Sequence, residues 1–335
     1  MKQDTPLNWG KLDQTVLSAE NPLAGRDLLR LLDLSPQELH LVLSTALSLK
    51  KLWKASPAKE QSSAPFPGQA IAIILEKPSL RTRVSFELAS ARLGAYPVVL
   101  SDTTSAFSRG ESIKDTMMVL ERYVSAVVIR SFAQTRIEEI AHWASVPVVN
   151  ALTDDFHPCQ VLADFITMYE YKGDLSKLKL AYVGDGGNNM AHTLLEGGAL
   201  CGMEVCVATP EDYQPNEGYL KQCLEVARAT GAKLSVCTDP KIALKDADVV
   251  ITDTWASMGS EDEHEERVKV FTPYQISSVS FELAAPGAIF MHCLPAHRGE
   301  EVTDEVMDAC YSAIYDEAEN RLHAQQALLM LLLAK

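Results

Sequence analysis

Short apolar segments typical of buried strands alternate along this chain with longer segments of helical periodicity. The first apolar segment runs from Ala70 to Leu75, and a helical segment follows from about Leu80 to Leu93, before Gly94. Strands that alternate with helices in this way are usually joined by crossover connections, which make neighbouring strands parallel. The pattern therefore predicts an α/β fold in which helices flank central parallel sheets.

The alternation forms two series, and a length of 335 residues fits two domains. The first series continues with predicted strands at 97–100, 126–129 and 146–149 and helices at 113–123 and 136–144. After a long helix at 158–171, the second series has predicted strands at 179–183, 204–208, 233–236, 249–252, 288–292 and 313–315. A last helix is predicted at 320–333. We expect two doubly wound domains.

Composition narrows the class of protein. The net charge of −15, without basic blocks, argues against a nucleic-acid partner, so an anionic ligand would need a local cluster of arginines. The longest apolar run, 327–334, is too short to span a membrane. Residues 1–10 show no targeting pattern, and the seven cysteines are scattered without a Cys-x-x-Cys motif. We expect a cytoplasmic protein without a structural metal site.

The segment Pro78 to Arg83 joins a predicted strand to a predicted helix. Ser79 is a plausible N-cap, and Thr82 with the N–H groups of the first turn would create an anion site suited to phosphate. The stripe expected to be buried on this helix is Val84, Leu88 and Ala91, which leaves Arg81 and Arg83 off the core face. A capped helix with arginines facing solvent remains the alternative.

Two further segments lie at predicted helix starts. In His157-Pro158-Cys159-Gln160, His157 and Gln160 are three apart and can face one ligand, although a histidine that merely caps its helix is the alternative. The turn 183–189 resembles a dinucleotide-binding turn, but Asn189 occupies the position of its third glycine. Its paired asparagines suit an amino-acid backbone, or form a simple Asx turn.

Two other segments follow predicted strands. Asp253 begins Asp253-Thr254-Trp255-Ala256-Ser257-Met258-Gly259, where a carboxylate could hold an ammonium group and the loop could move over a site. The alternative is a solvated acidic loop. The run 290–299 passes from apolar residues into Cys293 and the basic residues around it, at the sheet edge where ligands collect. An inert buried cysteine is the alternative here.

Together these motifs resemble the aspartate/ornithine carbamoyltransferase family. The motifs on which the resemblance rests are Ser-x-Arg-Thr-Arg at 79–83, His-Pro-Cys-Gln at 157–160 and His-Cys-Leu-Pro at 292–295. Within the family, Asp-x-x-x-Ser-Met-Gly at 253–259 is similar to the ornithine branch. The resemblance extends in matching order from Gly25 to His323 and thus covers nearly the whole chain.

The resemblance implies a carbamoyl phosphate domain at 1–155, joined by the last helix at 318–335, and an ornithine domain at 156–317. It implies transfer of a carbamoyl group from carbamoyl phosphate to the δ-amine of ornithine, giving citrulline and phosphate. No metal or organic cofactor is expected, since the leaving group is already activated. It also implies a homotrimer, or a multiple of trimers, with active sites shared between neighbouring chains.

The resemblance also assigns site residues. Those matching carbamoyl phosphate positions are Ser79, Leu80, Arg81, Thr82, Arg130, His157, Gln160, Cys293, Leu294 and Arg321, of which Arg130, His157 and Cys293 are the expected catalytic groups. Those matching ornithine positions are Asn189, Asp253, Ser257 and Met258. Where the family usually lends a glutamine to its neighbour, this chain has Ala106, and Arg109 is the candidate substitute. An extra glycine lengthens the turn before Asn189.

Several functions stay open from sequence alone. The acceptor amine could be acetylornithine, putrescine or aspartate, although Ser257-Met258-Gly259 favours ornithine. An NAD-dependent oxidoreductase is supported only by the glycines at 184–187. A catalytically silent relative is suggested only by Ala106.

Overall fold

The computed structural model describes residues 7, 9, 11–12, 21–55, 64–101, 110–256 and 263–334. It divides into two compact units: the first holds Lys11–Ile166 and Glu319–Lys335, and the second is essentially Thr167–Ala318. Each unit has one parallel sheet flanked by helices, which confirms the predicted fold class. Among the described helices, none combines the length and apolar character needed to cross a membrane.

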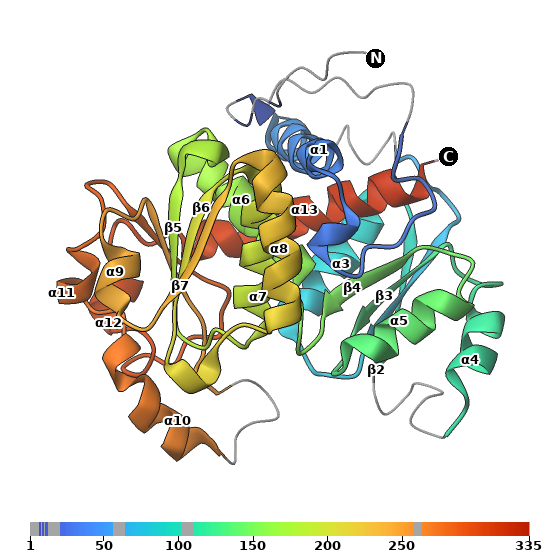
Figure 1. The fold of residues 1–335 in the computed structure, drawn as a ribbon. Helices are drawn as coiled ribbons and strands as arrows, with labels where there is room; N and C mark the ends of the chain where they lie inside the picture. The colour runs from blue at the N-terminus through green and yellow to red at the C-terminus, as the bar shows by residue number, and fades with distance from the viewer. Residues whose placement is uncertain are drawn as a thin grey trace. The chain divides into compact units, whose positions relative to one another are not determined.

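The first unit contains a four-stranded sheet with the order β2-β1-β3-β4 (Figure 1). Its strands are β1 (Ala70–Leu75), β2 (Tyr96–Ser101), β3 (Ala126–Arg130) and β4 (Val148–Leu152). Its helices include α1 (Pro36–Ala55), α3 (Leu80–Arg92), α4 (Ile113–Leu120) and α5 (Gln134–Trp143). All strand pairs are parallel.

The side chains of β1 alternate between the two faces of this sheet, as expected for a strand covered on both sides. Ala72 and Ile74 join a core cluster with Ile137 and Ile140 of α5 and Met117 of α4. Helix α3 contacts β1 and β2. Figure 1 shows α4 and α5 on one face of the sheet and α3 on the other.

The buried face of α3 differs from the predicted one. Val84 and Leu88 are 42% and 47% exposed, whereas Phe86 and Ala89 are fully buried. The buried face also includes Thr82, Ser85 and Ser90. The hydroxyls of Ser85 and Ser90 donate to the carbonyls of Arg81 and Phe86 at 2.6 and 2.7 Å, so polar residues fit this face. The prediction failed because it selected positions by apolar side chain alone.

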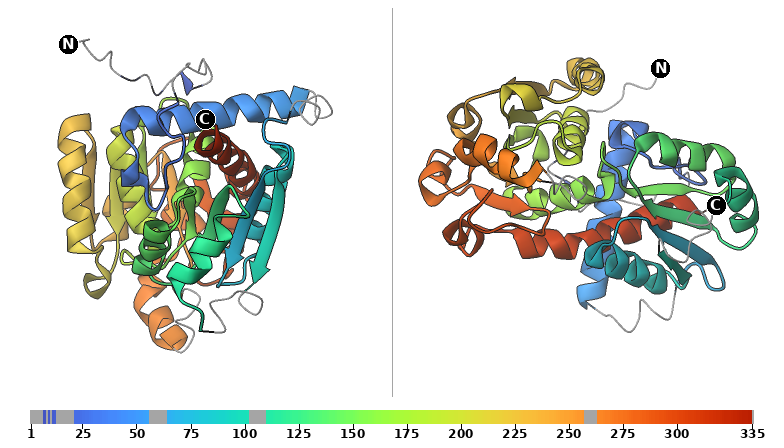
Figure 2. Two further views of the ribbon diagram at one scale, coloured as in Figure 1. Left: turned by 90° about the vertical axis from the view of Figure 1, so that its right-hand side faces the viewer. Right: turned by 90° about the horizontal axis from the view of Figure 1, so that it is seen from below.

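The last helix, α13 (Ile314–Leu333), begins where the sequence predicted a short strand at 313–315, so that strand prediction is wrong. The apolar pair Ala313 and Ile314 instead packs at the start of the helix, and Ser312 makes only an isolated bridge to Phe290. From Glu319 on, α13 belongs to the first unit, as predicted. Figure 1 and the left view of Figure 2 show α13 passing beside α1, and Lys50 Nζ of α1 donates to Asn320 Oδ1, in the second turn of α13, at 2.8 Å.

The second unit contains a five-stranded parallel sheet with the order β7-β6-β5-β8-β9. Its strands are β5 (Lys179–Val183), β6 (Glu204–Ala208), β7 (Lys233–Cys237), β8 (Val249–Thr252) and β9 (Ile289–His292). Its helices are α7 (Asn189–Cys201), α8 (Glu217–Thr230), α9 (Pro240–Leu244), α10 (His264–Phe271), α11 (Ser278–Phe281) and α12 (Asp304–Met307). Helix α6 (Pro158–Lys172) runs from the first unit into the second.

Helices α7 and α8 pack together on one side of this sheet, and α9, α11 and α12 lie on the other (Figure 1). The second side is filled by a cluster that includes Val183, Phe290, Trp255 and Phe271. On the first side, α7 approaches β6 closely at Gly198, where an added Cβ would lie 2.3 Å from Val205 Cγ2. Both faces of the sheet are therefore covered.

Each sheet has a point where the strand order reverses. In the first unit the chain moves from β1 out to β2 and returns to β3 on the other side of β1. In the second unit it moves from β5 out to β7 and returns to β8 on the other side of β5. Ligands of open α/β sheets bind beyond the carboxyl ends of the strands at this reversal. The residues after β1, β3, β5 and β8 are therefore the first place to look for a site.

Candidate functional site

The start of α3, shortly after β1, carries groups of the kind that bind anions. Ser79 caps the helix, and its Oγ accepts a hydrogen bond from Thr82 N at 3.2 Å. Its hydroxyl also donates to Thr82 Oγ1 at 3.1 Å. The side chain of Leu80 is 75% exposed, so only its backbone N–H is suited to ligand contact. The helix N-terminus, Arg81 and two ordered hydroxyls are suited to binding an anion such as phosphate.

Residues far apart in the sequence complete this cluster within the first unit. Arg321 of α13 donates from Nη1 to Gln160 Oε1 at 2.7 Å and from Nη2 to Thr82 Oγ1 at 3.4 Å. Gln160 in turn donates from Nε2 to Asp164 Oδ1 at 2.8 Å. All four side chains are buried. The guanidinium of Arg321 is therefore held in place by neighbours from α3 and α6.

His157, at the start of α6, is surrounded by positive charge. Burial lowers the pKa of its imidazole well below 6.5, and the nearby guanidiniums of Arg321, Arg130 and Arg81 lower that pKa further. Near pH 7 the ring is therefore neutral and can donate one hydrogen bond without carrying charge. Arg130, the last residue of β3, is only 6% exposed. The structure thus brings three predicted arginines around one predicted histidine.

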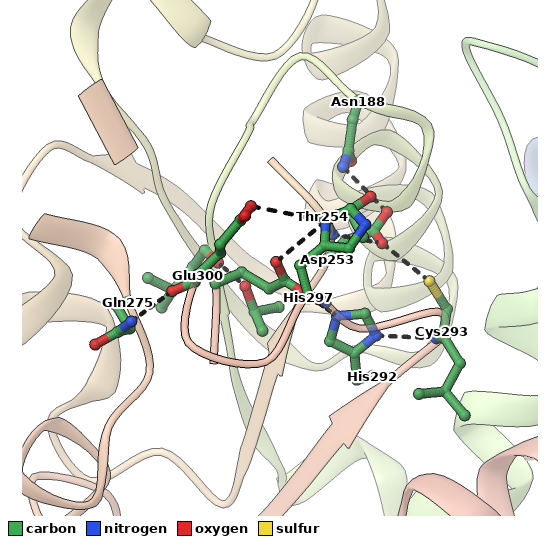
Figure 3. Close-up of polar contacts among 12 residues, drawn as sticks. Asn188, Asp253, Thr254, Gln275, His292, Cys293, His297 and Glu300 are labelled. Carbon is green, nitrogen blue, oxygen red and sulfur yellow. Dashed lines mark hydrogen bonds and ion pairs between the residues drawn. The ribbon is translucent and has the colours of Figure 1, made fainter. Parts of the chain in front are cut away.

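In the second unit, the carboxylate of Asp253 follows β8 and accepts hydrogen bonds at both oxygens (Figure 3). Cys293 Sγ donates to Oδ1 at 3.1 Å, and Thr254 N donates to the same oxygen at 2.8 Å. Asn188 Nδ2 donates to Oδ2 at 3.3 Å. These donors come from the ends of β8 and β9 and from the turn after β5. The cluster is suited to binding a cationic amine.

Asn188 lies in this cluster but is absent from the predicted ornithine-binding residues because, of the paired asparagines, only the neighbouring Asn189 was assigned there. Asn188 is the N-cap of α7, with its Oδ1 accepting from Ala191 N at 2.9 Å. Its Nδ2 also donates to the buried hydroxyl of Tyr182 at 2.8 Å. Asn189 is the first residue of α7. The preference of asparagine for N-cap positions was the available signal for Asn188.

In the glycine turn after β5, backbone N–H groups donate hydrogen bonds to side chains of the same unit. Gly186 N donates to Thr209 Oγ1 at 2.9 Å, and Gly187 N donates to Asp185 Oδ1 at 2.9 Å. A Cβ on Gly186 would lie 2.8 Å from Tyr213 O, so the glycine serves close packing within the unit. A pyrophosphate would need these N–H groups. The turn is therefore not arranged for a dinucleotide.

The end of β9 carries a hydrogen-bond chain behind Cys293. His292 Nδ1 accepts from Leu294 N at 2.9 Å, and its Nε2 lies 3.2 Å from Glu301 Oε1. Because Nδ1 accepts, the ring proton lies on Nε2 and points at the carboxylate. His292 N also donates to Glu317 Oε2 at 2.8 Å. Leu294 takes a left-handed backbone conformation with φ 58°. The loop that bears Cys293 and Leu294 is thus fixed by buried polar contacts.

Four residues singled out in the sequence lie outside the described part of the chain. They are the predicted ornithine-binding residues Ser257 and Met258, together with Ala106 and Arg109.

Two segments of the chain match known protein domains. Residues 26–170 match the carbamoyl-P binding domain of the aspartate/ornithine carbamoyltransferases, and residues 176–332 match their Asp/Orn binding domain. Together these matches cover most of the chain. This chain belongs to the aspartate/ornithine carbamoyltransferase family.

Similar proteins within the family carry a more specific name. An ornithine carbamoyltransferase of Anoxybacillus flavithermus is 48% identical over 320 residues, which span 95% of this chain and 99% of that protein. A Pyrococcus furiosus relative, named as the anabolic ornithine carbamoyltransferase, is 47% identical over 93% of this chain and 97% of its own length. The solved structure of the ornithine carbamoyltransferase from Pyrococcus furiosus superposes with a TM-score of 0.87 and covers 93% of this chain and 98% of that one.

Proposed function

We propose that this protein is an ornithine carbamoyltransferase of arginine metabolism. It transfers the carbamoyl group of carbamoyl phosphate to the δ-amine of L-ornithine and releases L-citrulline and phosphate. The observation that carries the proposal is the neutral His157 among Arg81, Arg130 and Arg321, beside a capped helix start. Relatives of this name at 47–48% identity over more than nine tenths of the chain support it.

Carbamoyl phosphate is assigned to the cluster in the first unit. Arg81, Ser79, Thr82 and the N–H groups of the first turn of α3 bind the phosphate and neutralise its charge as it leaves. Arg130 and the neutral His157 donate to the carbonyl oxygen, on which negative charge grows as the tetrahedral intermediate forms. Gln160 and Arg321 hold the cluster in position.

Ornithine is assigned to the cluster in the second unit. Asp253 binds the cationic amine, while Cys293 and Asn188 fix the orientation of that carboxylate. The δ-amine loses its proton and attacks the carbonyl carbon. The first proton has gone to solvent before the attack. The new C–N bond forms, the C–O bond to phosphate breaks, and the departing phosphate takes the second proton from the nitrogen. Orienting two bound reactants in this way can lower the barrier by roughly 7–11 kcal/mol.

The assembly proposed is a homotrimer or a multiple of it. Apolar side chains at Leu80, Val84 and Leu88 are exposed at intervals of four along α3. Such a stripe on one helix face supports contact between copies of the chain. Size-exclusion chromatography with light scattering should give a mass three times that of the chain, or a multiple of it. A monomer would overturn this part of the proposal.

A citrulline assay tests the reaction itself. The purified chain is incubated with carbamoyl phosphate and, in separate samples, with ornithine, acetylornithine, putrescine or aspartate. Carbamoylated product and phosphate should form in equal amounts, and ornithine should be the best acceptor. Faster turnover of another amine would contradict the assigned acceptor. Binding of carbamoyl phosphate without product from any amine would instead identify a silent relative.

A further inference from the structure

A second cluster of metal-ligand residue types lies in the second unit, in the loop between β9 and α12. It consists of His297, Glu300 and Glu301, whose ligand atoms all lie within 4.8 Å of one another. His297 Nδ1 lies 3.8 Å from Glu300 Oε2 and 3.9 Å from Glu301 Oε2. The proposed reaction uses none of these three side chains.

His264, at the start of α10, adds a second imidazole. Its Nε2 lies 3.3 Å from Glu300 Oε1, so Glu300 stands between two histidines. The rings of His264 and His297 have centroids 6.3 Å apart and are nearly perpendicular. Figure 3 shows His297 and Glu300 on the loop that continues from Cys293. Helix α10 therefore places a second imidazole beside Glu300, at the edge of the cluster.

Within the described residues, the carboxylates of this cluster pair with no lysine or arginine. Glu301 is completely buried, and its Oε2, like Oε2 of Glu300, makes no hydrogen bond. In the described part of the chain, the ion-pair partners of both carboxylates are histidines, not lysine or arginine. A buried carboxylate oxygen without a hydrogen-bond donor is costly, and a cation at this point would satisfy it.

The loop is held in shape by its backbone. Gln275 Nε2 donates to the carbonyls of Gly299 and Glu300 at 2.8 and 2.7 Å. Gly299, with φ 90°, donates from N to Val302 O at 2.8 Å. Glu300 N donates to His297 O at 2.9 Å. Because the turn is already formed, little backbone ordering would accompany ligand binding.

We propose that His297, Glu300 and Glu301, with His264 beside Glu300, form a binding site for a divalent transition metal ion of the Zn²⁺ type. Imidazole and carboxylate ligands suit such ions, whereas Mg²⁺ and Ca²⁺ prefer oxygen alone. With metal–ligand bonds of about 2.0–2.2 Å, tetrahedral ligand atoms lie about 3.3–3.6 Å apart. The spacings of 3.8 and 3.9 Å reach this range after shifts of a few tenths of an ångström at His297.

The site would act on the substrate-binding loop through Glu301. Its Oε1 faces His292 Nε2, at 3.2 Å, and accepts from His297 N at 2.5 Å. His292 directly precedes Cys293. A metal ion on Oε2 of Glu301 would therefore stabilise the orientation of the loop that carries Cys293 and Leu294. This is a positioning role, separate from the transfer chemistry.

Absorption spectroscopy with Co²⁺ tests the proposal on the full chain. We expect one Co²⁺ per chain with visible bands of nitrogen and oxygen ligation, displaced by Zn²⁺ but not by a large excess of Mg²⁺ or Ca²⁺. His297→Ala should weaken Co²⁺ binding at least tenfold, and His264→Ala should weaken it by a smaller factor. His142→Ala is the matched control, since it removes an exposed imidazole on α5, and should bind Co²⁺ as the wild type does.

Two outcomes would overturn the proposal. One is Co²⁺ binding that is absent, or unchanged in His297→Ala. The other is a thiolate charge-transfer band that disappears in Cys293→Ser, because it would place the ion on Asp253, His292 and Cys293 instead. His297 is 44% exposed, so the metal-free His297→Ala protein should melt as the wild type does. Thermal melting therefore separates lost binding from lost folding.

Discussion

Arg321 donates a hydrogen bond to Gln160 over 2.7 Å, although the two residues lie 161 positions apart in the sequence. Both belong to the first unit, because the chain returns to that unit at Glu319. The last helix therefore contributes a buried guanidinium to the cluster around His157. The last helix thus contributes to this polar cluster as well as to the packing of the unit.

The substitution Arg321→Lys keeps the positive charge but removes the planar guanidinium group and its two-pronged hydrogen-bond geometry. One lost hydrogen bond to a charged group costs about 1.5–3 kcal/mol, which corresponds to a fall of about 10- to 150-fold in kcat/KM for carbamoyl phosphate. Steady-state kinetics with saturating ornithine measure this fall. Lys54→Ala removes an exposed cation of α1 that pairs with Glu319, and it should leave kcat/KM unchanged.

Arg81 and Arg83 lie two residues apart on α3 and should differ sharply in function. Arg81→Ala should raise KM for carbamoyl phosphate about 10-fold or more, since a charged contact to phosphate is lost. Arg83 makes an exposed ion pair with Glu87 at 3.1 Å, so Arg83→Ala should change KM and stability little. Saturation curves for both variants decide this. Equal effects of the two substitutions would refute the assignment of the phosphate to Arg81.

The thiol of Cys293 is a hydrogen-bond donor to Asp253. Cys293→Ser keeps a donor at this place, whereas Cys293→Ala removes it. We expect KM for ornithine to rise several-fold in the serine variant and about 10-fold or more in the alanine variant. Steady-state kinetics at a series of pH values measure KM for ornithine in both variants. If both variants keep the wild-type rate and pH profile, the thiol has no part in orienting the amine.

His157 should make the protein less stable in mild acid. The pKa of its buried imidazole is lowered well below 6.5, so the unfolded chain takes up a proton below about pH 6.5 while the folded chain does not. Folding stability is therefore lost as the pH falls through this range. His157→Gln should flatten that slope in urea unfolding between pH 7.5 and pH 5.5. The exposed His142, changed to Gln, should leave the slope as in the wild type.

The sequence was sufficient for the parts of the site that depend on local order. Ser79 was predicted as the cap of α3, and Pro158 as the first residue of α6, because these preferences act over a few residues. Both sheets were predicted from strand and helix alternation. The pairing of Arg321 with Gln160 was not derivable locally, and only the family resemblance placed both residues in one site.

The two predictions that were wrong, a strand at 313–315 and the buried stripe of α3, also have local causes. The strand predicted at 313–315 came from three residues that suit either a strand or the first turn of a helix, and packing at the start of α13 decided between them. On α3, serines replaced the expected apolar stripe because their hydroxyls bond within the helix. Residue type alone gives no account of such internal bonds.

The close approach of α7 to β6 provides a test of packing in the second unit. In the Gly198→Ala variant the new methyl group would lie 2.3 Å from Val205 Cγ2, so α7 and β6 must move apart. Overpacking of this kind costs about 1–3 kcal/mol. Val205→Ala removes the clashing methyl group but leaves a small cavity when made alone. The double variant should therefore be more stable than the sum of the two single losses predicts, as measured by urea unfolding. Additive losses would mean that the contact does not limit how closely α7 packs on the sheet.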